Sequence, residues 1–202
     1  MMLTDRPGDL FDRLRENILA KISLGDDEFR AGAAYFTPRN MARREFLLQA
    51  GEVCRDIAFV GQGCLRYYTI DEKGSEHVIQ FAIEGWWIAD LYSYHAEAPS
   101  DGYIDALEDS ELLLLSRENL ENLCLSIPAF ERFFRLLIQN SFVAYRKRVA
   151  ESLSNSAEVR YLTFLETYPQ LVHRLPQHQI ASWLGITPEA LSRIRNKIAR
   201  RK

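Results

Sequence analysis

Residues 177–197, QHQIASWLGITPEALSRIRNK, have the residue types and spacing of a helix-turn-helix motif. The small side chain of Ala181 lets a second helix approach closely, and Gly185 can adopt the positive φ of a tight turn. Thr187 is a good N-cap, and Pro188 suits the first position of the second helix. We therefore predict two short helices joined by a turn. The core between them would consist of Ile180, Leu184, Leu191 and Ile194.

The outward face of the second predicted helix has the chemistry of a surface that binds double-stranded DNA. Arg193 can donate two hydrogen bonds to guanine, and Glu189 can accept one from the amino group of cytosine. Lys197 and Arg200 suit phosphates, which are contacted regardless of sequence. We predict a DNA interface formed by Gln177, His178, Thr187, Glu189, Ser192, Arg193, Asn196, Lys197 and Arg200. The alternative is a helix pair that only packs inside the protein.

The charge distribution also separates the C-terminal part from the rest of the 202-residue chain. The formal net charge is −3. Residues 1–126 contain 12 Lys and Arg against 23 Asp and Glu, whereas residues 127–202 contain 13 against 5. This asymmetry favours two modules with different partners. The six positive charges among the last ten residues could also form a merely solvated basic tail.

Two further patterns indicate the elements that must position this motif. Residues 3–30 have aliphatic residues at a spacing of four, which predicts a helix. Short runs rich in β-branched and aromatic residues, separated by turn residues, then predict an antiparallel sandwich or barrel. The runs lie at 46–49, 56–60, 64–70, 77–83, 103–107 and 111–115.

A helix is expected over residues 128–152, with no Pro or Gly after Pro128 itself. One stripe along it has the spacing of a two-helix interface, which favours a homodimer over a helix covered by its own chain. The predicted dimer interface consists of Phe130, Phe134, Leu137, Ser141, Tyr145 and Arg148. The polar break at 152–156 would be a hinge, followed by a helix over 157–168 that Pro169 ends. The expected domains are 1–126, 127–152 and 153–202.

Several protein classes are not favoured. No apolar run approaches the roughly 18 residues of a membrane span, and residues 1–20 lack a signal-peptide core, so we expect a cytoplasmic protein without membrane contact. The three cysteines form no CxxC pair and are too scattered for a disulfide framework or a metal site. We find no nucleophile–base constellation and no phosphate-cradling glycine loop, so we predict that the chain is not an enzyme.

The barrel, long helix and C-terminal helix-turn-helix together resemble the Crp/Fnr family of transcription regulators. The resemblance is most specific at 186–195, ITPEALSRIR, which is similar to the family's recognition-helix motif E-x-x-[GS]-R. By that match Glu189, Ser192 and Arg193 fall on the base-reading positions. The resemblance implies an α+β fold: a cyclic-nucleotide-binding-like jelly-roll barrel, a dimerisation helix and a winged-helix-like domain. It also implies a homodimer on a two-fold related DNA site, with RNA polymerase as a further candidate partner.

The predicted barrel departs from this family at the phosphate cassette. Cyclic-AMP receptors have Gly-Glu followed ten residues later by Arg-[Ser/Thr]-Ala, whereas this chain has Ala89-Asp90 and Ser100-Asp101-Gly102. No Lys or Arg occurs between Glu76 and Asp109, so a phosphate would lack its counter-charge. The predicted barrel pocket consists of Trp86, Ala89, Asp90, Ser100, Asp101 and Tyr103.

The sequence therefore does not favour cyclic AMP, and no cofactor is assigned. Aromatic residues near the cassette could plug the barrel, or they could hold an unidentified neutral or cationic small-molecule effector. The function favoured is a DNA-binding transcription regulator. The alternative function is a small-molecule binding module whose helix-turn-helix serves protein contacts.

Overall fold

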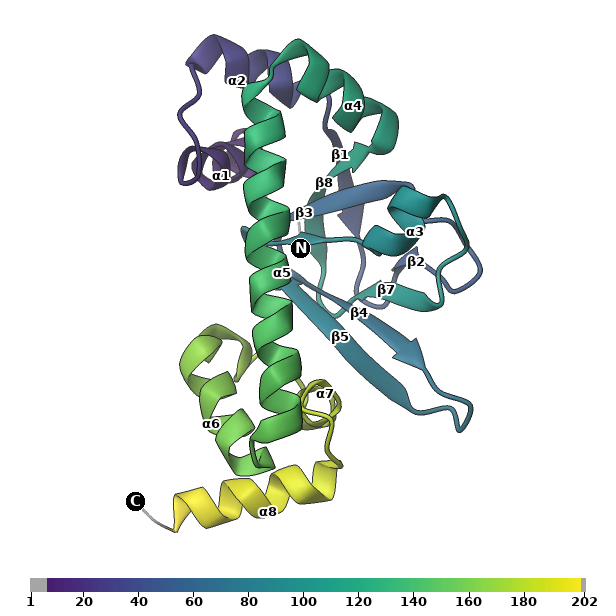
Figure 1. The fold of residues 1–202 in the computed structure, drawn as a ribbon, viewed down its shortest axis with the longest axis vertical. Helices are drawn as coiled ribbons and strands as arrows, with labels where there is room; N and C mark the ends of the chain where they lie inside the picture. Colours follow the sequence, from purple (N-terminus) through teal and green to yellow (C-terminus); the bar gives the residue numbers. More distant parts are fainter. Residues whose placement is uncertain (1–6, 201–202) are drawn as a thin grey trace. The chain divides into compact units, whose positions relative to one another are not determined.

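The computed structural model describes residues 7–200 (Figure 1). The described chain divides into two compact units. The first contains the residues up to Thr69 together with Ile79–Ile138. The second contains Ile70–Val78 together with the chain from Gln139 onward. These units differ from the expected domains, because residues of the long helix belong to both and a hairpin tip joins the C-terminal helices.

The first unit begins with two helices, α1 (Pro7–Leu19) and α2 (Asp26–Ala33). The expectation of one helix over 3–30 was therefore wrong, and residues 3–6 lie outside the described part. Helix α2 starts with three acidic residues, Asp26–Glu28. Negative side chains stabilise a helix N-terminus, because this end of the helix dipole is positive. The Glu28 carboxylate accepts a hydrogen bond from the backbone N–H of Gly25 at 2.9 Å, which fixes the new start.

Within the described residues, eight strands form two four-stranded sheets, with the orders β1-β8-β3-β6 and β2-β7-β4-β5. Their bounds are β1 (Thr37–Met41), β2 (Phe46–Leu48), β3 (Asp56–Gln62), β4 (Cys64–Ile70), β5 (Glu76–Ile83), β6 (Trp87–Ile88), β7 (Gly102–Ala106) and β8 (Ser110–Ser116). The result is an antiparallel sandwich rather than a closed barrel. The sequence missed β1, whose Pro38 is tolerated because β1 is an edge strand. It also missed the two-residue β6.

Three helices follow or interrupt the strands. They are α3 (Leu91–Ala96), α4 (Arg117–Ser126) and α5 (Ala129–Ser154). The sequence missed α3, which is only six residues long and starts at an N-cap, Asp90. The start of α5 belongs to the sandwich core, because Trp87 lies 5.8 Å from Phe133 and 5.6 Å from Phe134 between ring centroids. Ring contacts therefore fix the beginning of the long helix.

The second unit is helical apart from the hairpin tip. After α5 come α6 (Ala157–Thr167), a short 3₁₀ turn (Pro169–Leu171), α7 (Gln177–Trp183) and α8 (Pro188–Ala199). Pro169 ends α6 as predicted. Within residues 7–200 no strand follows Ser116, so the wing that the family resemblance implied is not formed there.

Candidate nucleic-acid interface

Helices α7 and α8 form the helix-turn-helix expected from the sequence. Gly185 has φ +66° in the turn, a conformation that glycine adopts without a Cβ penalty. The hydroxyl of Thr187 accepts a hydrogen bond from the N–H of Ala190 at 3.2 Å, which caps α8. Ile180 and Leu191 are fully buried between the two helices. The motif is therefore held by local geometry and a small apolar core.

The outward face of α8 is exposed and polar. Arg193, Asn196, Lys197 and Arg200 line a shallow depression along it. Glu189 accepts hydrogen bonds from its own backbone N–H and from Thr187, which hold the pKa of its carboxyl below the usual value. Glu189 is therefore an ionised acceptor near neutral pH. All nine residues predicted to contact DNA are exposed: Gln177, His178, Thr187, Glu189, Ser192, Arg193, Asn196, Lys197 and Arg200.

A single arginine links the end of the long helix to the turn of the motif. The guanidinium of Arg160, near the start of α6, donates to the carbonyl of Asn155 at 2.8 Å and to that of Leu184 at 3.0 Å. Both carbonyls lie at helix C-termini, where a positive charge is favourable. Sequence reasoning missed this residue, because the two carbonyls are brought together only by folding.

The hairpin between β4 and β5 contacts α7 within the second unit. The hydroxyl of Ser182 donates to the carbonyl of Glu76 at 2.6 Å and accepts from the N–H of Val78 at 2.9 Å. At the tip, His77 contacts Asp71 at 2.8 Å, and this hydrogen bond is the main reason why the pKa of the Asp71 carboxyl lies below its usual value. A strand segment distant in sequence is thus attached to the first helix of the motif.

The predicted dimer stripe is only partly available to another chain. Phe130 and Phe134 are buried in the core of the first unit, so their assignment to a dimer interface was wrong. The helical spacing was right, but the first turns of α5 cover the sandwich instead. Ser141 and Tyr145 are exposed, whereas Leu137 is half-buried.

Arg148, the last residue of that stripe, is also half-buried, and its guanidinium lies 5.1 Å from the ring centroid of Trp183. Burial holds the pKa of Arg148 below its usual value. The exposed large apolar residues of α5 are Ile138, Phe142, Val143, Tyr145, Val149 and Leu153. The apolar surface that α5 presents to solvent therefore lies mainly beyond its first two turns.

The cassette region of the sandwich forms a closed hydrogen-bond network. Asp90 and Ser100 are 6% and 2% exposed, and the Ser100 hydroxyl donates to the Asp90 carboxylate at 2.6 Å. The same carboxylate accepts from the Tyr67 hydroxyl at 3.2 Å and from the N–H of Ser93 at 3.1 Å. Burial, with the Asp90 charge as a smaller cause, raises the pKa of Tyr67 to about 12, so Tyr67 remains a donor.

Sequence reasoning missed Tyr67, because its hydrogen bond to Asp90 joins residues that are 23 positions apart in the chain. Tyr103, by contrast, was wrongly placed in the pocket. Tyr103 pairs with Tyr68 across β4 and β7, and their rings stack at 5.3 Å between centroids. Because side chains alternate along a strand, Tyr103 faces away from the side shared by Tyr67 and Ile104.

The other predicted pocket residues differ in burial. Trp86 and Ala89 are partly buried against the sandwich core, and Asp101 is exposed. The aromatic residues nearby do not line one cavity either, since Tyr92 is 73% exposed and Tyr94 is buried. The structure therefore brings together Asp90 and Ser100 from the predicted set, and adds Tyr67.

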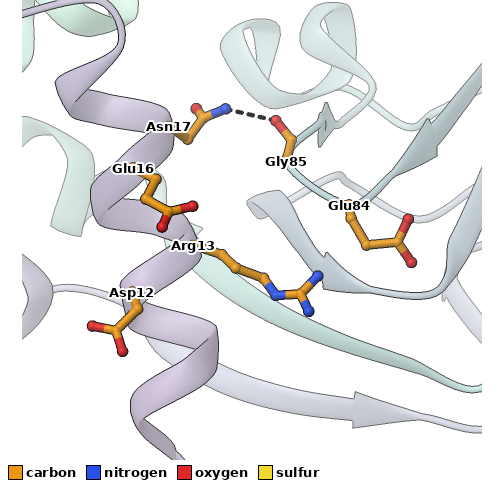
Figure 2. A pocket seen from close by; sticks show the side chains of 6 residues that line it. All are labelled: Asp12, Arg13, Glu16, Asn17, Glu84 and Gly85. Carbon is orange, nitrogen blue, oxygen red and sulfur yellow. Dashed lines mark hydrogen bonds between the residues drawn. The ribbon is translucent and has the colours of Figure 1, made fainter.

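A separate depression of about 480 Å³ lies between α1 and the turn after β5 (Figure 2). Figure 2 shows the Asn17 amide directed at the carbonyl of Gly85, to which it donates at 2.7 Å. Arg13, the one cationic residue of the lining, donates to the carbonyl of Gly61 at 2.9 Å. The depression is otherwise lined by the carboxylates of Asp12, Glu16 and Glu84. Three carboxylates disfavour an anionic ligand at this position.

Comparisons with known proteins agree with this architecture. A family model described as a cyclic nucleotide-binding domain matches residues 38–126. The regulatory protein HlyX of Actinobacillus pleuropneumoniae is 24% identical over 165 residues, covering 75% of this chain and 67% of the relative. The fumarate and nitrate reduction regulatory protein of Vibrio cholerae is 24% identical over 163 residues, covering 73% and 63%. This chain thus spans about two thirds of the length of these curated relatives.

Solved structures show the same fold. A CooA mutant from Carboxydothermus hydrogenoformans aligns with a TM-score of 0.71 at 17% identity, covering 98% of this chain and 87% of the other. FixK2 from Bradyrhizobium japonicum aligns with a TM-score of 0.69 at 16% identity, covering 82% and 85%.

None of the described helices has the length and apolar character needed to cross a membrane. The curated relatives carry the names of regulators, in line with the prediction that this chain is not an enzyme. In its similarity to these regulators and in the order of sandwich, long helix and helix-turn-helix, the chain resembles the Crp/Fnr regulators.

Proposed function

We propose that the protein is a homodimeric transcription regulator that binds double-stranded DNA through α8. The observation that carries this proposal is the exposed outward face of α8, which presents Arg193, Asn196, Lys197 and Arg200 along one depression. A face that only packed inside the protein would be apolar and covered. Binding to DNA also requires the compartment that contains it, which for this protein would be the cytoplasm.

The side chains of the motif have different roles in this proposal. Arg193 and Glu189 read base edges in the major groove, and Ser192 contacts a base or a phosphate. Lys197 and Arg200 contact phosphates and position the helix without reading sequence. Gln177 and His178, in the first turn of α7, contact the DNA backbone.

The exposed apolar side chains of α5 support a dimer. Phe142 and Val143 are 64% and 65% exposed, and Leu153 is 84% exposed, on a helix whose length suits pairing with a second copy. A two-fold pair would present two α8 helices to half-sites about one helical turn apart. RNA polymerase is a further partner if the regulator activates transcription.

Selection of bound DNA from a random duplex pool tests this function with the protein alone. Enrichment of a palindrome with half-sites one turn apart is the expected result. Arg193→Ala, selected in parallel, should give weaker enrichment and a relaxed base preference. Binding that shows no sequence enrichment and no dependence on salt would instead favour a helix-turn-helix used for protein contacts.

We also propose that the sandwich does not bind cyclic AMP. Two hydroxyls and one N–H of the chain already occupy Asp90, and Ser100 offers no positive charge to a phosphate. Titration calorimetry with cyclic AMP should therefore show no binding at micromolar concentrations. Micromolar binding would mean that another group neutralises the phosphate. If cyclic AMP does not bind, any effector of the sandwich is a molecule without a phosphate to be paired at this position.

A further inference from the structure

One basic residue on the DNA-facing side of α8 is paired with an acidic residue of another helix. The Nζ of Lys197 lies 2.5 Å from the Oε2 of Glu158. Glu158 is in the first turn of α6, where the helix N-terminus stabilises a carboxylate. Its side chain is 20% exposed, whereas that of Lys197 is 54% exposed. The carboxylate is therefore the more fixed partner of the pair.

This ion pair contributes little to the stability of the fold. Partly exposed ion pairs contribute little to stability, because water screens them and long side chains lose freedom. A phosphate that approached Lys197 would instead meet a carboxylate within ion-pair distance of the same ammonium group. It would have to displace that carboxylate or accept its repulsion.

We propose that Glu158 neutralises Lys197 and thereby lowers the sequence-independent affinity of the protein for DNA. This inference rests on the proposed DNA-binding function and deepens it. Phosphate contacts carry no sequence information, so Glu158 acts on the affinity for every duplex and not on the choice among bases. The residue sets how tightly the recognition helix is held on non-target DNA. It acts through Lys197 and does not itself contact the nucleic acid.

The test measures binding of the full chain to a random-sequence duplex as a function of salt. Freeing one phosphate contact steepens the slope of log K against log salt by about 0.9, which corresponds to roughly eightfold tighter binding at 0.1 M salt. Glu158→Gln should therefore bind about three- to tenfold more tightly, with a steeper slope. Glu166→Gln removes the same charge from an exposed position on α6 and is the matched control, expected to change affinity by less than about twofold.

Two further variants isolate the pair. In a Lys197→Gln background, Glu158→Gln should leave affinity unchanged, because the group that it releases is absent. Arg200→Gln, on the same depression, should weaken binding more than Lys197→Gln does in the wild-type background. Thermal melting checks that each variant is folded.

The outcomes separate this inference from the proposed function. Wild-type binding with no change in Glu158→Gln overturns the inference and leaves the function standing. The inference is also overturned if Glu166→Gln tightens binding equally, or if the gain persists without Lys197. A wild-type chain that binds no duplex at any salt concentration overturns both.

Discussion

The cassette region of the sandwich and the outward face of α8 are both polar, but they use their polar groups in opposite ways. In the cassette, Asp90 is buried and accepts three hydrogen bonds from its own chain. On α8, Arg193 and Arg200 are exposed and line an open depression. A satisfied, buried carboxylate contributes to stability, whereas exposed cations remain available to an external anion. Internal hydrogen bonding of the polar groups, rather than residue type alone, therefore separates a structural polar cluster from a binding surface.

Removal of the Asp90 carboxylate would disrupt the cassette network at its centre. Asp90→Ala leaves the hydroxyls of Ser100 and Tyr67 and the N–H of Ser93 without their acceptor. Because buried donors without partners are costly, we expect a loss of about 2–4 kcal/mol in the free energy of unfolding, measured by urea denaturation.

The matched control is Asp101→Ala, an exposed neighbour whose replacement should change the free energy of unfolding by less than about 0.5 kcal/mol. Equal losses for the two variants would contradict a structural role of Asp90. If Asp90→Ala were as stable as the wild-type protein, the network would be dispensable, and the region would have to be reconsidered as a ligand site.

The second test concerns the exposed face. Arg193→Ala should weaken binding to the selected operator by about 1–3 kcal/mol, because a bidentate contact to guanine is lost, while the free energy of unfolding stays nearly unchanged. Arg195→Ala, on the same helix but outside the outward face, is the control and should lose much less operator affinity. If Arg193→Ala and Arg195→Ala bound the operator with equal affinity, Arg193 would not be one of the base-reading residues.

The structure also shows which features a sequence can specify. The helix-turn-helix was predictable because each requirement is local: a small residue at 181, a glycine at 185 and an N-cap at 187 follow one another within a few residues. Strands β4 and β5 were predictable for the same reason, since turn residues separate two β-rich runs. Strand β1 was not, because only its place at a sheet edge makes Pro38 acceptable.

The periodicity of apolar residues correctly indicated the spacing of helices and strands. It did not indicate which part of the protein each face packs against. The stripe containing Phe130 and Phe134 has the spacing of a helix interface, yet its first residues cover the sandwich core. Tyr103 lies near Asp101 in sequence but on the other side of its strand from the cassette. The hydroxyl of Tyr67 on β4 donates to Asp90, which lies 23 residues away in the chain. These assignments depend on contacts between distant segments, which a single sequence does not contain.

The hydroxyls of Ser100 and Ser182 both donate hydrogen bonds within the chain, but they differ in burial. Ser100 is buried, so water cannot replace its bond to Asp90, whereas Ser182 is only partly buried. Ser182→Ala should therefore lower the free energy of unfolding by about 0.5–1 kcal/mol at most, against about 1–3 kcal/mol for Ser100→Ala.

The local readout for Ser182 is hydrogen exchange at the Val78 amide, which donates to the Ser182 hydroxyl. That amide should exchange up to about fivefold faster in Ser182→Ala. Exposed Ser192→Ala should leave it unchanged, and an unchanged Val78 rate in Ser182→Ala would show that the hairpin tip is held to α7 by other contacts.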